Sequence, residues 1–503
     1  MGQYLLGLDN GGTNIKAVIF DVEGNSIAAA YEQVDLITHG EGRTERDMDL
    51  LWKANYKVLK QVIEKADINP KEILGISLSG HGKGLYLWGM DDKPAYNGIE
   101  STDTRAYMYP EKWNNDGTAD KIYKKTCQKI LACQPVSLIS WLKDNDPEVI
   151  NNTKWIFGVK DYIRFRLTGE ANAEITDISG SNLVNIIDKK FDKELLSDFG
   201  LEEIYDKLPP LKYSTDICGY ITHDVSQLTG APEGTPVVAG MFDIDACAIA
   251  MNITDENNLC IIAGTWSINE YISKKPILNK TVAMNSLYCM PGYYLIEESS
   301  PTSAANNEWF INKFMGEEKQ LAKERGINVY EIMNGMVESV KPGEQNIIFL
   351  PYIFGSNYNP QAKACLIGMD SSHTKAQIAR SIFEGIVFCH KVHIEKLLMN
   401  DFKPSTVRLA GGAANSKVWV QIFADVINLP IEIVDTNELG SLGSAMAAGV
   451  AVGVYNDLKD AAKKLVKIKY RIEPIQENVE IYKSKFELYK KTADALDVLW
   501  KNF

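Results

Sequence analysis

Short apolar runs alternate with longer helical patterns in the first part of the chain. Residues 4–8 and 15–20 are apolar runs on either side of DNGGTN, whose Asp, Asn and Gly residues are typical of a hairpin turn. A third strand is expected over 25–34, and the apolar spacing over 48–66 predicts an amphipathic helix. Strands that alternate with helices in this way indicate an α/β fold.

The strand–turn–strand pattern of the first residues returns halfway along the chain. Buried strands are expected over 73–80 and 235–243, and a polar break over 252–258 follows them. Directly after the break, LCIIAGTWSINEYIS repeats a strand, a Gly-Thr turn and a strand, although without an aspartate at the turn. This echo indicates two related halves. We therefore place the boundary at the break and expect two domains, 1–252 and 253–503.

The second half also mixes strands and helices. From residue 407, VRLAGGAANSKVWVQIFADVI predicts a strand, a glycine-rich turn and a helix. Small residues line a further helix that is expected over 438–455. Near the end, apolar residues at helical spacing predict an amphipathic helix that packs on the second domain; they are Val479, Tyr482, Phe486, Tyr489, Ala493 and Leu496.

Three glycine-rich turns that follow apolar strands are candidate phosphate-binding elements. Glycine lets backbone N–H groups approach a phosphate closely, and a threonine or a lysine adds a further donor. A carboxylate beside a phosphate needs a cation between them, so Asp9 would face Mg²⁺, which tends to keep its waters. No P-loop pattern is present, and a single turn of this kind is usually structural. The turns contain Asp9, Asn10, Gly11, Gly12 and Thr13, with Lys16 nearby; Gly264 and Thr265; and Gly411, Gly412, Ala413, Ala414 and Asn415.

Composition and charge narrow the class of protein. The 503 residues carry a formal net charge of −13, which argues against sequence-independent nucleic-acid binding, since such binding needs a positive surface. The 8 cysteines form no CxxC pair, so we expect reduced thiols in a cytoplasmic protein. The apolar runs are too short to span a bilayer, and no membrane partner is expected.

Several long motifs stand in order along nearly the whole chain. They are GLDNGGTNIKAVIFD, KDYIRFRLTGE with TDISGSN, GTPVVAGMFDIDACA, IIAGTWS and LAGGAANSKVWVQIFADVI. Together they resemble the FGGY carbohydrate kinases, which belong to the actin-like ATPase superfamily. SGHGKGLYLW, STDTRA and SSPTSAANNEWF are most similar to the L-xylulose (3-keto-L-gulonate) kinase branch of that family. His81 stands where we expect a glutamine in that branch, which leaves the sugar open.

The resemblance implies two actin-like, ribonuclease H-like ATPase domains around a central cleft. The domain over 1–252 would bind the sugar, and the domain over 253–503 would bind ATP, with Mg²⁺ as a cofactor. Closure of the cleft would exclude water, so we expect ATP hydrolysis without sugar to be slow. Analogy with the family suggests a homodimer, and the sequence itself leaves the oligomeric state open.

The resemblance places the general base at Asp243, within GTPVVAGMFDIDACA. The residues agree with this role, because Asp243 follows an apolar strand and α/β active sites gather at the carboxyl ends of strands. It would take the proton from the sugar hydroxyl and, with Asp9, would face the metal. The alternative is that Asp243 only caps a helix that begins near Ile244. Asp245 is the competing carboxylate, and we expect it to be exposed or to cap the helix.

The resemblance also implies binding residues. Lys83 and Asp103 would contact sugar hydroxyls, with His81 and Asp243 in the same pocket. Arg105 would instead be structural if it pairs with an acid. On the nucleotide side, the implied residues are Asp9, Gly11, Gly12, Thr13 and Lys16 in the first turn, Gly264 and Thr265 at the β- and γ-phosphates, Gly412, Ala413 and Asn415 beside the adenosine, and Glu308.

These observations lead us to expect an ATP-dependent kinase of a small sugar, with a ketopentose such as L-xylulose as the acceptor. The alternative substrates to L-xylulose or a ketogulonate are D-xylulose, L-ribulose, glycerol or erythritol. The alternatives from other classes are a non-catalytic sugar-sensing protein and a different actin-like ATPase, such as a chaperone or filament protein. Asp243 and the motifs SGHGKG and STDTR favour the kinase. The phosphorylated position and the oligomeric state stay open.

Overall fold

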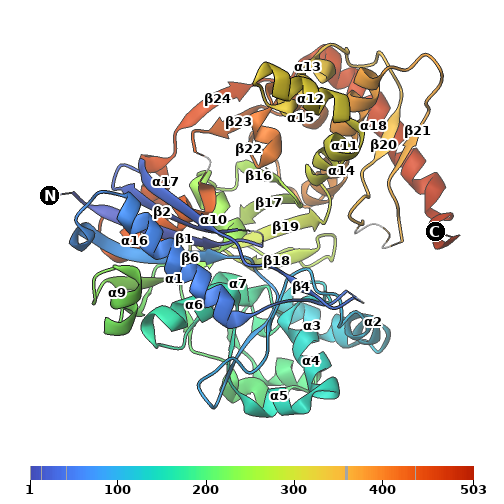
Figure 1. Cartoon of the computed structure of the whole chain (residues 1–503). Helices are drawn as coiled ribbons and strands as arrows, with labels where there is room; N and C mark the ends of the chain where they lie inside the picture. The colour runs from blue at the N-terminus through green and yellow to red at the C-terminus, as the bar shows by residue number, and fades with distance from the viewer. Residues whose placement is uncertain are drawn as a thin grey trace. The chain divides into compact units, whose positions relative to one another are not determined.

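The chain divides into two compact units, each built from three segments (Figure 1). Unit 1 comprises Met1–Thr254, Ile272–Ile296 and Thr436–Val466, and unit 2 comprises Asp255–Tyr271, Glu297–Asp435 and Lys467–Phe503. The first passage between the units therefore falls inside the polar break over 252–258. The structure is a computed structural model that describes all residues except Met1, Thr13, Glu41, Asn357, Tyr358, Pro360, Asn437 and Phe503.

Unit 1 contains a six-stranded sheet in the order β14-β15-β6-β1-β2-β3. β1 (Tyr4–Asn10) and β2 (Ile15–Asp21) form the predicted antiparallel hairpin, in which Asp9 lies opposite Lys16. β6 runs parallel to β1 and to β15, so the carboxyl ends of these three strands meet at one edge of the sheet. The predicted strands at β3, β6 and β15 are confirmed; the remaining bounds are β3 (Ser26–Glu32), β6 (Ile73–Gly80), β14 (Ile217–Tyr220) and β15 (Pro236–Phe242).

Helices cover both faces of this sheet. α1 (Met48–Lys65), the predicted amphipathic helix, packs on the face that carries Leu6. α16 (Leu439–Ala451) packs on β1 and β6 from the other face, since neighbouring side chains of a strand alternate between faces. The approach is close: a Cβ added to Gly7 would lie 1.9 Å from the carbonyl oxygen of Ser441. The small residues of α16 therefore let a late segment of the chain complete the core of unit 1.

Unit 2 repeats the strand pattern of unit 1. Its strands pair in the order β17-β16-β22-β23-β24, with contacts that are antiparallel, parallel, parallel and antiparallel. The order β2-β1-β6-β15-β14 of unit 1 has the same succession of directions. This confirms the echo between the two glycine turns at the level of topology. The bounds are β16 (Asn258–Ala263), β17 (Ser267–Ser273), β22 (Thr406–Ala410), β23 (Ile431–Val434) and β24 (Ile468–Ile472).

The C-terminal helix packs within unit 2, as its apolar spacing predicts. α18 (Gln476–Asp497) lies against α14 (Lys375–Leu398) and α15 (Lys417–Ile427). Its buried face consists of Val479, Tyr482, Lys485, Phe486 and Tyr489.

A buried ion cluster joins α14 to α18. The Glu384 carboxylate accepts hydrogen bonds from Arg380 Nε at 2.8 Å and from the Tyr482 hydroxyl at 3.0 Å. It also pairs with Lys485 Nζ at 2.6 Å. Because every one of these groups is buried, the cluster ties the terminal helix to the unit through matched charges.

The other elements complete the two units (Figure 1). The short strands of unit 1 are β4 (Ile37–Thr38), β5 (Thr44–Arg46), β7 (Tyr86–Gly89), β8 (Gly98–Ile99), β9 (Thr153–Phe157), β10 (Ala173–Glu174), β11 (Val184–Asn185), β12 (Lys190–Phe191), β13 (Leu211–Lys212) and β18 (Met284–Leu287). Its other helices are α2 (Met108–Asn115), α3 (Thr118–Thr126), α4 (Pro135–Asn145), α5 (Pro147–Asn152), α6 (Val159–Thr168), α7 (Ile175–Ser179), α8 (Lys193–Asp198), α9 (His223–Thr229), α10 (Asp243–Ala250) and α17 (Leu458–Leu465). The remaining elements are β19 (Tyr294–Ser300), β20 (Ile348–Leu350), β21 (Cys365–Ile367), α11 (Ala305–Phe314), α12 (Gly316–Arg325) and α13 (Val329–Glu338).

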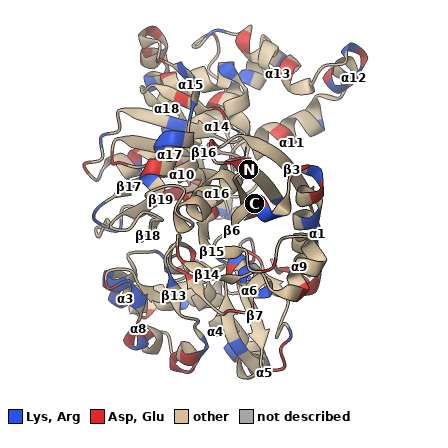
Figure 2. Cartoon of the chain, turned by 90° about the vertical axis from the view of Figure 1, so that its left-hand side faces the viewer, with Lys and Arg blue, Asp and Glu red and all other residues tan. Residues whose placement is uncertain are grey.

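Charged residues of both signs share the outer helices. Figure 2 shows this on α3 and α12, where Lys or Arg stands close to Asp or Glu along the helix. Among the described residues, no helix is both long and apolar enough to cross a membrane.

Candidate active site

Asp243 lies where β15 ends, and it is the first residue of α10 (Asp243–Ala250). The N-cap of this helix is Phe242, and the Asp243 carboxylate accepts a hydrogen bond from the backbone N–H of Ile244. The role as a base and the helix-capping alternative for Asp243 therefore both stay predictions. Burial, together with the nearby charge of Asp9, raises the pKa of Asp243 to about 7. A carboxylate with such a pKa can accept a proton near neutral pH and release it again.

Asp9 sits in the last part of β1, beside the end of β6. Its Oδ1 accepts a hydrogen bond from the Ser79 hydroxyl at 2.7 Å, while burial raises the pKa of Asp9. Across the hairpin, Lys16 pairs with Glu438 at 2.8 Å and lies over the ring of Tyr31. Burial alone would lower the pKa of Lys16, but the hydrogen bond and charge of Glu438, together with the charges of Tyr31 and Asp9, outweigh burial and raise the pKa.

The turn after Asp9 is tied to the body of unit 1. The Gly11 amide donates to the carbonyl of Asn14 at 3.1 Å, and the carbonyl of Gly12 accepts from Arg46 Nη2. Thr13, which was predicted to bind phosphate, lies outside the described residues.

His81 belongs to a buried group that the sequence did not predict. Its Nε2 is 3.4 Å from Glu100 Oε2 and 3.1 Å from the Tyr86 hydroxyl, which itself donates to Glu100 at 2.7 Å. Arg46 pairs with the other oxygen of Glu100 at 3.1 Å. Burial alone would raise the pKa of Glu100, but the charges of His81 and Arg46 lower it to about 2. Burial alone would lower the pKa of His81, but the charge and the hydrogen bond of Glu100 raise it. Glu100 therefore favours the charged imidazolium form of His81.

Lys83 lies on the same turn and reaches toward the strand that carries the candidate base. Its φ is 63°, an unusual backbone value for a residue with a side chain. Its ammonium group is 5.8 Å from the centroid of the Phe242 ring, one residue before Asp243. Gly82 makes room for that ring, because a Cβ there would lie 2.5 Å from it. The turn therefore brings Lys83 close to β15.

Asp103 is fully buried and holds Arg105. Its carboxylate accepts bonds from the Thr44 amide at 2.7 Å and from Arg105 Nη2 at 2.8 Å, Nε at 3.0 Å and backbone N at 2.9 Å. Arg105 also pairs with Glu45 at 2.7 Å. Arg105 is thus paired with two acids, and its structural role and the sugar contact of Asp103 both stay predictions.

Asp245 differs from the expectation of an exposed or capping acid, which is wrong. Its side chain is fully buried, and its Oδ1 accepts a hydrogen bond from the Cys289 amide at 2.8 Å. Asp245, in the first turn of α10, faces the interior of unit 1 and anchors a neighbouring loop instead of facing water.

Unit 2 contains a cavity of about 630 Å³ that brings together five of the nucleotide residues predicted in the second half of the chain. Gly264, Thr265, Glu308, Gly412 and Asn415 line it, whereas Ala413 is buried in the adjoining turn. The other lining residues were not predicted: Ala304, Ala305, Asn307, Asn328, Tyr330, Glu331, Asn334, Phe383, Ser416 and Trp419. Ala304, Ala305 and Asn307 lie in SSPTSAANNEWF, and Ser416 and Trp419 lie in LAGGAANSKVWVQIFADVI, two motifs that carry the family resemblance. The others come from α13 and its N-cap and from α14, which no quoted motif marks.

A buried histidine supports the Gly-Thr turn of this cavity. His390 on α14 is hydrogen-bonded to Ser267 at 3.0 Å and Asn269 at 2.8 Å, both just after the turn, and to Ser303 at 2.8 Å. Burial lowers the pKa of His390 to about 3, so the ring is neutral. A neutral ring can donate to one of these partners and accept from another.

The residues fit a nucleotide and a magnesium ion. In the cavity, Asn307 Oδ1 is buried without a hydrogen-bond partner in the described structure, and Gly264 has open space where a Cβ would stand. The charge of Asp9 raises the cost of ionising Asp243, which a cation would relieve. The described residues contain no cluster of three or more metal-binding side chains, but Mg²⁺ needs only one or two carboxylates beside phosphate and water.

Comparison with known proteins identifies the family. Residues 4–250 match the N-terminal domain of the FGGY family of carbohydrate kinases, and residues 259–452 match its C-terminal domain. The chain belongs to this family. As an FGGY carbohydrate kinase, it is an ATP-dependent sugar kinase.

Two curated FGGY relatives match over nearly their whole length. The chain is 34% identical to a probable L-xylulose kinase of Pasteurella multocida over 497 residues, which covers 99% of each chain. It is also 34% identical to the L-xylulose/3-keto-L-gulonate kinase of Escherichia coli, with 99% of this chain and 98% of that protein covered.

Solved FGGY structures share the fold. A gluconate kinase from Lactobacillus acidophilus matches with a TM-score of 0.91 at 24% identity, and a ligand-bound xylulose kinase from the same organism matches with a TM-score of 0.90 at 25% identity. Both matches cover 100% of each chain. The predicted two-domain α/β kinase fold is confirmed.

Proposed function

We propose that this kinase phosphorylates a hydroxyl group of a small ketopentose such as L-xylulose, with Asp243 as the general base. The observation that carries the proposal is the position of Asp243 at the end of β15, with a pKa of about 7. The 34% identity to proteins named for L-xylulose supports the substrate class. His81, Lys83 and Asp103 are the proposed sugar-binding residues, and 1–252 is the proposed sugar-binding domain.

The proposed reaction moves one proton and one phosphoryl group. The Asp243 carboxylate accepts the proton of the sugar hydroxyl, and the freed oxygen forms a bond to the γ-phosphorus of ATP. The bond from that phosphorus to the β–γ bridging oxygen breaks, and ADP carries the electron pair away. His81, which Glu100 favours in its charged form, and Lys83 place positive charge in the same unit as the two aspartates. Mg²⁺, when bound near Asp9 and Asp243, would neutralise phosphate charge.

The nucleotide belongs to the proposed domain 253–503. The cavity of unit 2 supports this, since Gly264 and Thr265 would meet the β- and γ-phosphates, and Gly412, Ala413 and Asn415 would lie beside the adenosine. Glu308 lines the same cavity and would accept hydrogen bonds from the nucleoside. In the first turn, Gly11, Gly12 and Lys16 are the proposed phosphate contacts.

A substrate panel tests the proposal. ADP release with magnesium and ATP would be measured for L-xylulose, D-xylulose, L-ribulose, glycerol and erythritol, with wild type, Asp243→Asn and Asp245→Asn. We expect one ketopentose to dominate. Asp243→Asn is expected to lower kcat by about 10²–10⁴-fold, as loss of a general base does. Asp245→Asn keeps an oxygen for the Cys289 amide and is expected to retain most of the activity.

Each part of the proposal can fail separately. Preference for glycerol or erythritol would overturn the ketopentose assignment and leave the kinase in place. Full activity of Asp243→Asn would remove Asp243 as the base. Binding of sugar without any phosphate transfer would favour the non-catalytic sugar-sensing alternative.

A further inference from the structure

The strand that carries Asp243 is irregular just before it reaches that residue. The register between β15 and β6 shifts between Val238 and Met241. Within the shift, Gly240 has a φ of 79°, and a Cβ there would lie 1.8 Å from the carbonyl oxygen of Leu78. Such a bulge bends a strand and re-aims the side chains that follow it. The direction in which Asp243 leaves the sheet therefore depends on what holds this bulge.

Groups from outside the sheet hold the backbone of the bulge. Arg164 Nη1 donates to the Ala239 carbonyl at 2.8 Å, and the Ala239 amide donates to the carbonyl of Asp216 at 2.8 Å. The Gly240 amide donates to the carbonyl of Ser214 at 3.1 Å. These bonds replace the ladder bonds that the shifted register loses.

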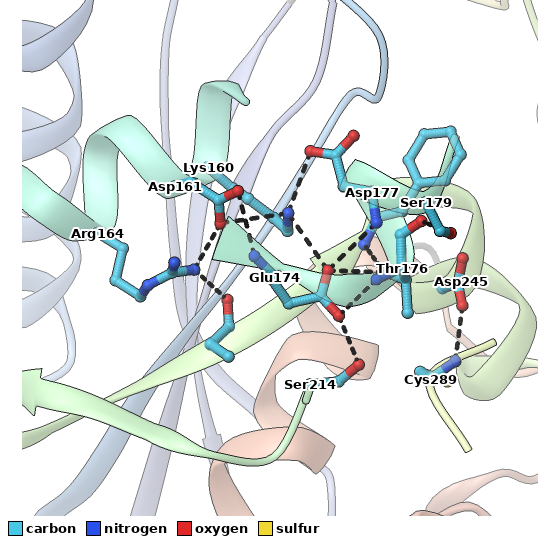
Figure 3. Close-up of polar contacts among 12 residues, drawn as sticks. Lys160, Asp161, Arg164, Glu174, Thr176, Asp177, Ser179, Ser214, Asp245 and Cys289 are labelled. Atoms are coloured by element: carbon cyan, nitrogen blue, oxygen red, sulfur yellow. Dashed lines mark hydrogen bonds and ion pairs between the residues drawn. The ribbon is translucent and has the colours of Figure 1, made fainter. Parts of the chain in front are cut away.

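One further hydrogen bond to β15 comes from a side chain and lies next to Asp243. The Phe242 amide donates to Thr176 Oγ1 at 2.9 Å, and the Thr176 hydroxyl donates to Glu174 Oε2 at 2.7 Å. Glu174 also accepts from the Ser214 hydroxyl at 2.8 Å (Figure 3). Thr176 is fully buried, so its proton has a fixed direction and its lone pairs face the amide.

A buried lysine holds Glu174 in place. Lys160 Nζ lies 3.3 Å from Glu174, 3.1 Å from Asp177 and 3.4 Å from Asp161, and none of these side chains is more than slightly exposed (Figure 3). Asp161 in turn pairs with Arg164 at 2.7 Å, the residue that holds the bulge from its other end. Side chains from α6, β10 and α7 thus form one connected charge network behind the end of β15.

We propose that Thr176 is a positioning residue for Asp243. The charge network around Lys160 orients the Thr176 hydroxyl, the hydroxyl holds the Phe242 amide, and the held amide sets where the Asp243 carboxylate stands. This inference rests on the proposed role of Asp243 as the base. Thr176 touches neither substrate, and its effect on the reaction passes entirely through Asp243.

The experiment compares two buried threonines of unit 1. Thr229, at the end of α9, is also fully buried, donates to the Val225 carbonyl at 2.7 Å and accepts from the Ala231 amide at 3.1 Å. Thr176→Val, Thr176→Ala, Thr176→Ser and Thr229→Val would be assayed for kcat, for the KM of sugar and ATP, and for Tm. A misplaced base costs up to about 10²-fold in rate.

We expect Thr176→Val and Thr176→Ala to lower kcat by about 10- to 100-fold while the KM for ATP stays within about twofold. Thr176→Ser restores most of kcat because it keeps the hydroxyl. Thr229→Val keeps kcat even where it lowers Tm. In the Asp243→Asn background, Thr176→Val causes no further loss of the residual rate, whereas a general structural role would lower that rate as well.

The inference is overturned if Thr176→Val and Thr176→Ala keep the kcat of Thr229→Val, if serine does not rescue, or if Thr176→Val lowers the residual rate of Asp243→Asn. These outcomes are separate from failure of the proposed function, which shows as full activity of Asp243→Asn. If the valine variant does not fold, the alanine variant, which adds no methyl group beside the hydroxyl's partners, decides the question through the same kcat and rescue measurements.

Discussion

The two units share a strand pattern and differ in the side chains at the ends of those strands. In unit 1, the edge where β1, β6 and β15 end carries Asp9, His81 and Asp243, and a buried charge network lies behind it (Figure 3). In unit 2, the turn after β16 has no carboxylate, and glycines, amides and aromatic rings dominate the cavity. A repeated backbone thus offers the same positions twice, and in unit 1 the positions at the strand ends carry Asp9 and Asp243.

Unit 2 also contains buried charged side chains, but they lie between two helices and do not line the cavity. Glu384, Arg380 and Lys485 join α14 to α18, and none of them lines the cavity as described. Buried charge therefore lies behind the proposed reaction centre in one unit and joins packed helices in the other. This difference can be tested with the two buried lysines.

The largest effect is expected from Lys160→Met. The change leaves Glu174 and Asp177 buried without their cation, and breaking a buried pair in this way costs about 3–5 kcal/mol. Lys485→Met leaves Glu384 with Arg380 and Tyr482, so we expect a smaller loss of about 1–3 kcal/mol. Denaturant unfolding measures both.

The kcat of the folded fraction then separates the two lysines. Lys160→Met should lower it strongly, since it disturbs the residues behind Asp243, and Lys485→Met should leave it near the wild-type value. Equal losses of kcat in the two variants would erase the distinction between the units.

A second prediction concerns the cost of keeping Asp243 ionised. Its pKa is raised from 3.8 to about 7 in the folded chain, so the unfolded chain releases the proton first, and stability falls as the pH rises between these values. Asp243→Asn lacks this cost. We expect the variant to be more stable than wild type by about 1–4 kcal/mol at about pH 8, with a gain that shrinks as the pH falls toward 4.

Thermal unfolding at several pH values checks this prediction. Activity should move in the opposite direction, because kcat/KM of the wild type falls as Asp243 becomes protonated below about pH 7. If Asp243→Asn and the wild type were equally stable at every pH, the pKa of Asp243 would not be raised by its surroundings.

The smallest effect is expected in unit 2. Gly411 has a φ of 86°, and a Cβ there would lie 2.5 Å from the carbonyl oxygen of Ala263. Gly411→Ala should distort the turn and weaken ADP binding by about tenfold, as a strain of about 1–2 kcal/mol would. Gly316→Ala is the matched control, since its Cβ would meet nothing within 4 Å.

Calorimetric titration with ADP measures this change, and sugar binding should stay the same in both variants. If Gly411→Ala weakened sugar binding as much as nucleotide binding, the two functions would not be divided between the units as proposed.

Local patterns predicted the parts of the fold that local residues determine. The hairpin around DNGGTN, the strand over 73–80 and the helix over 48–66 each have their own apolar period and turn residues, and all are present. The placement of α16 in unit 1 could not be read in this way. It depends on a match between small residues at Gly7 and along α16, which lie at opposite ends of the chain.

The candidate site likewise contains residues that the sequence marks and residues that only the fold brings together. The glycine turns and Asp243 stand directly after strands, so sequence position alone marks them. Glu100 and Arg46 are ordinary charged residues in the sequence, and only the fold brings them onto His81. Asp245 misled the prediction, because the sequence of a short helix does not show which of its side chains meets water, and that of Asp245 is fully buried.

The late position of α16 in the chain has a consequence for synthesis in the cell. β1 and β6 leave the ribosome near the beginning of translation, and the helix that packs on them is made only near its end. Through most of that time, the face of the sheet around Gly7 has no native cover. A nascent chain that stalls before residue 439 therefore presents an uncovered apolar sheet to its neighbours and to chaperones, which makes completion of this enzyme a matter of timing as well as of stability.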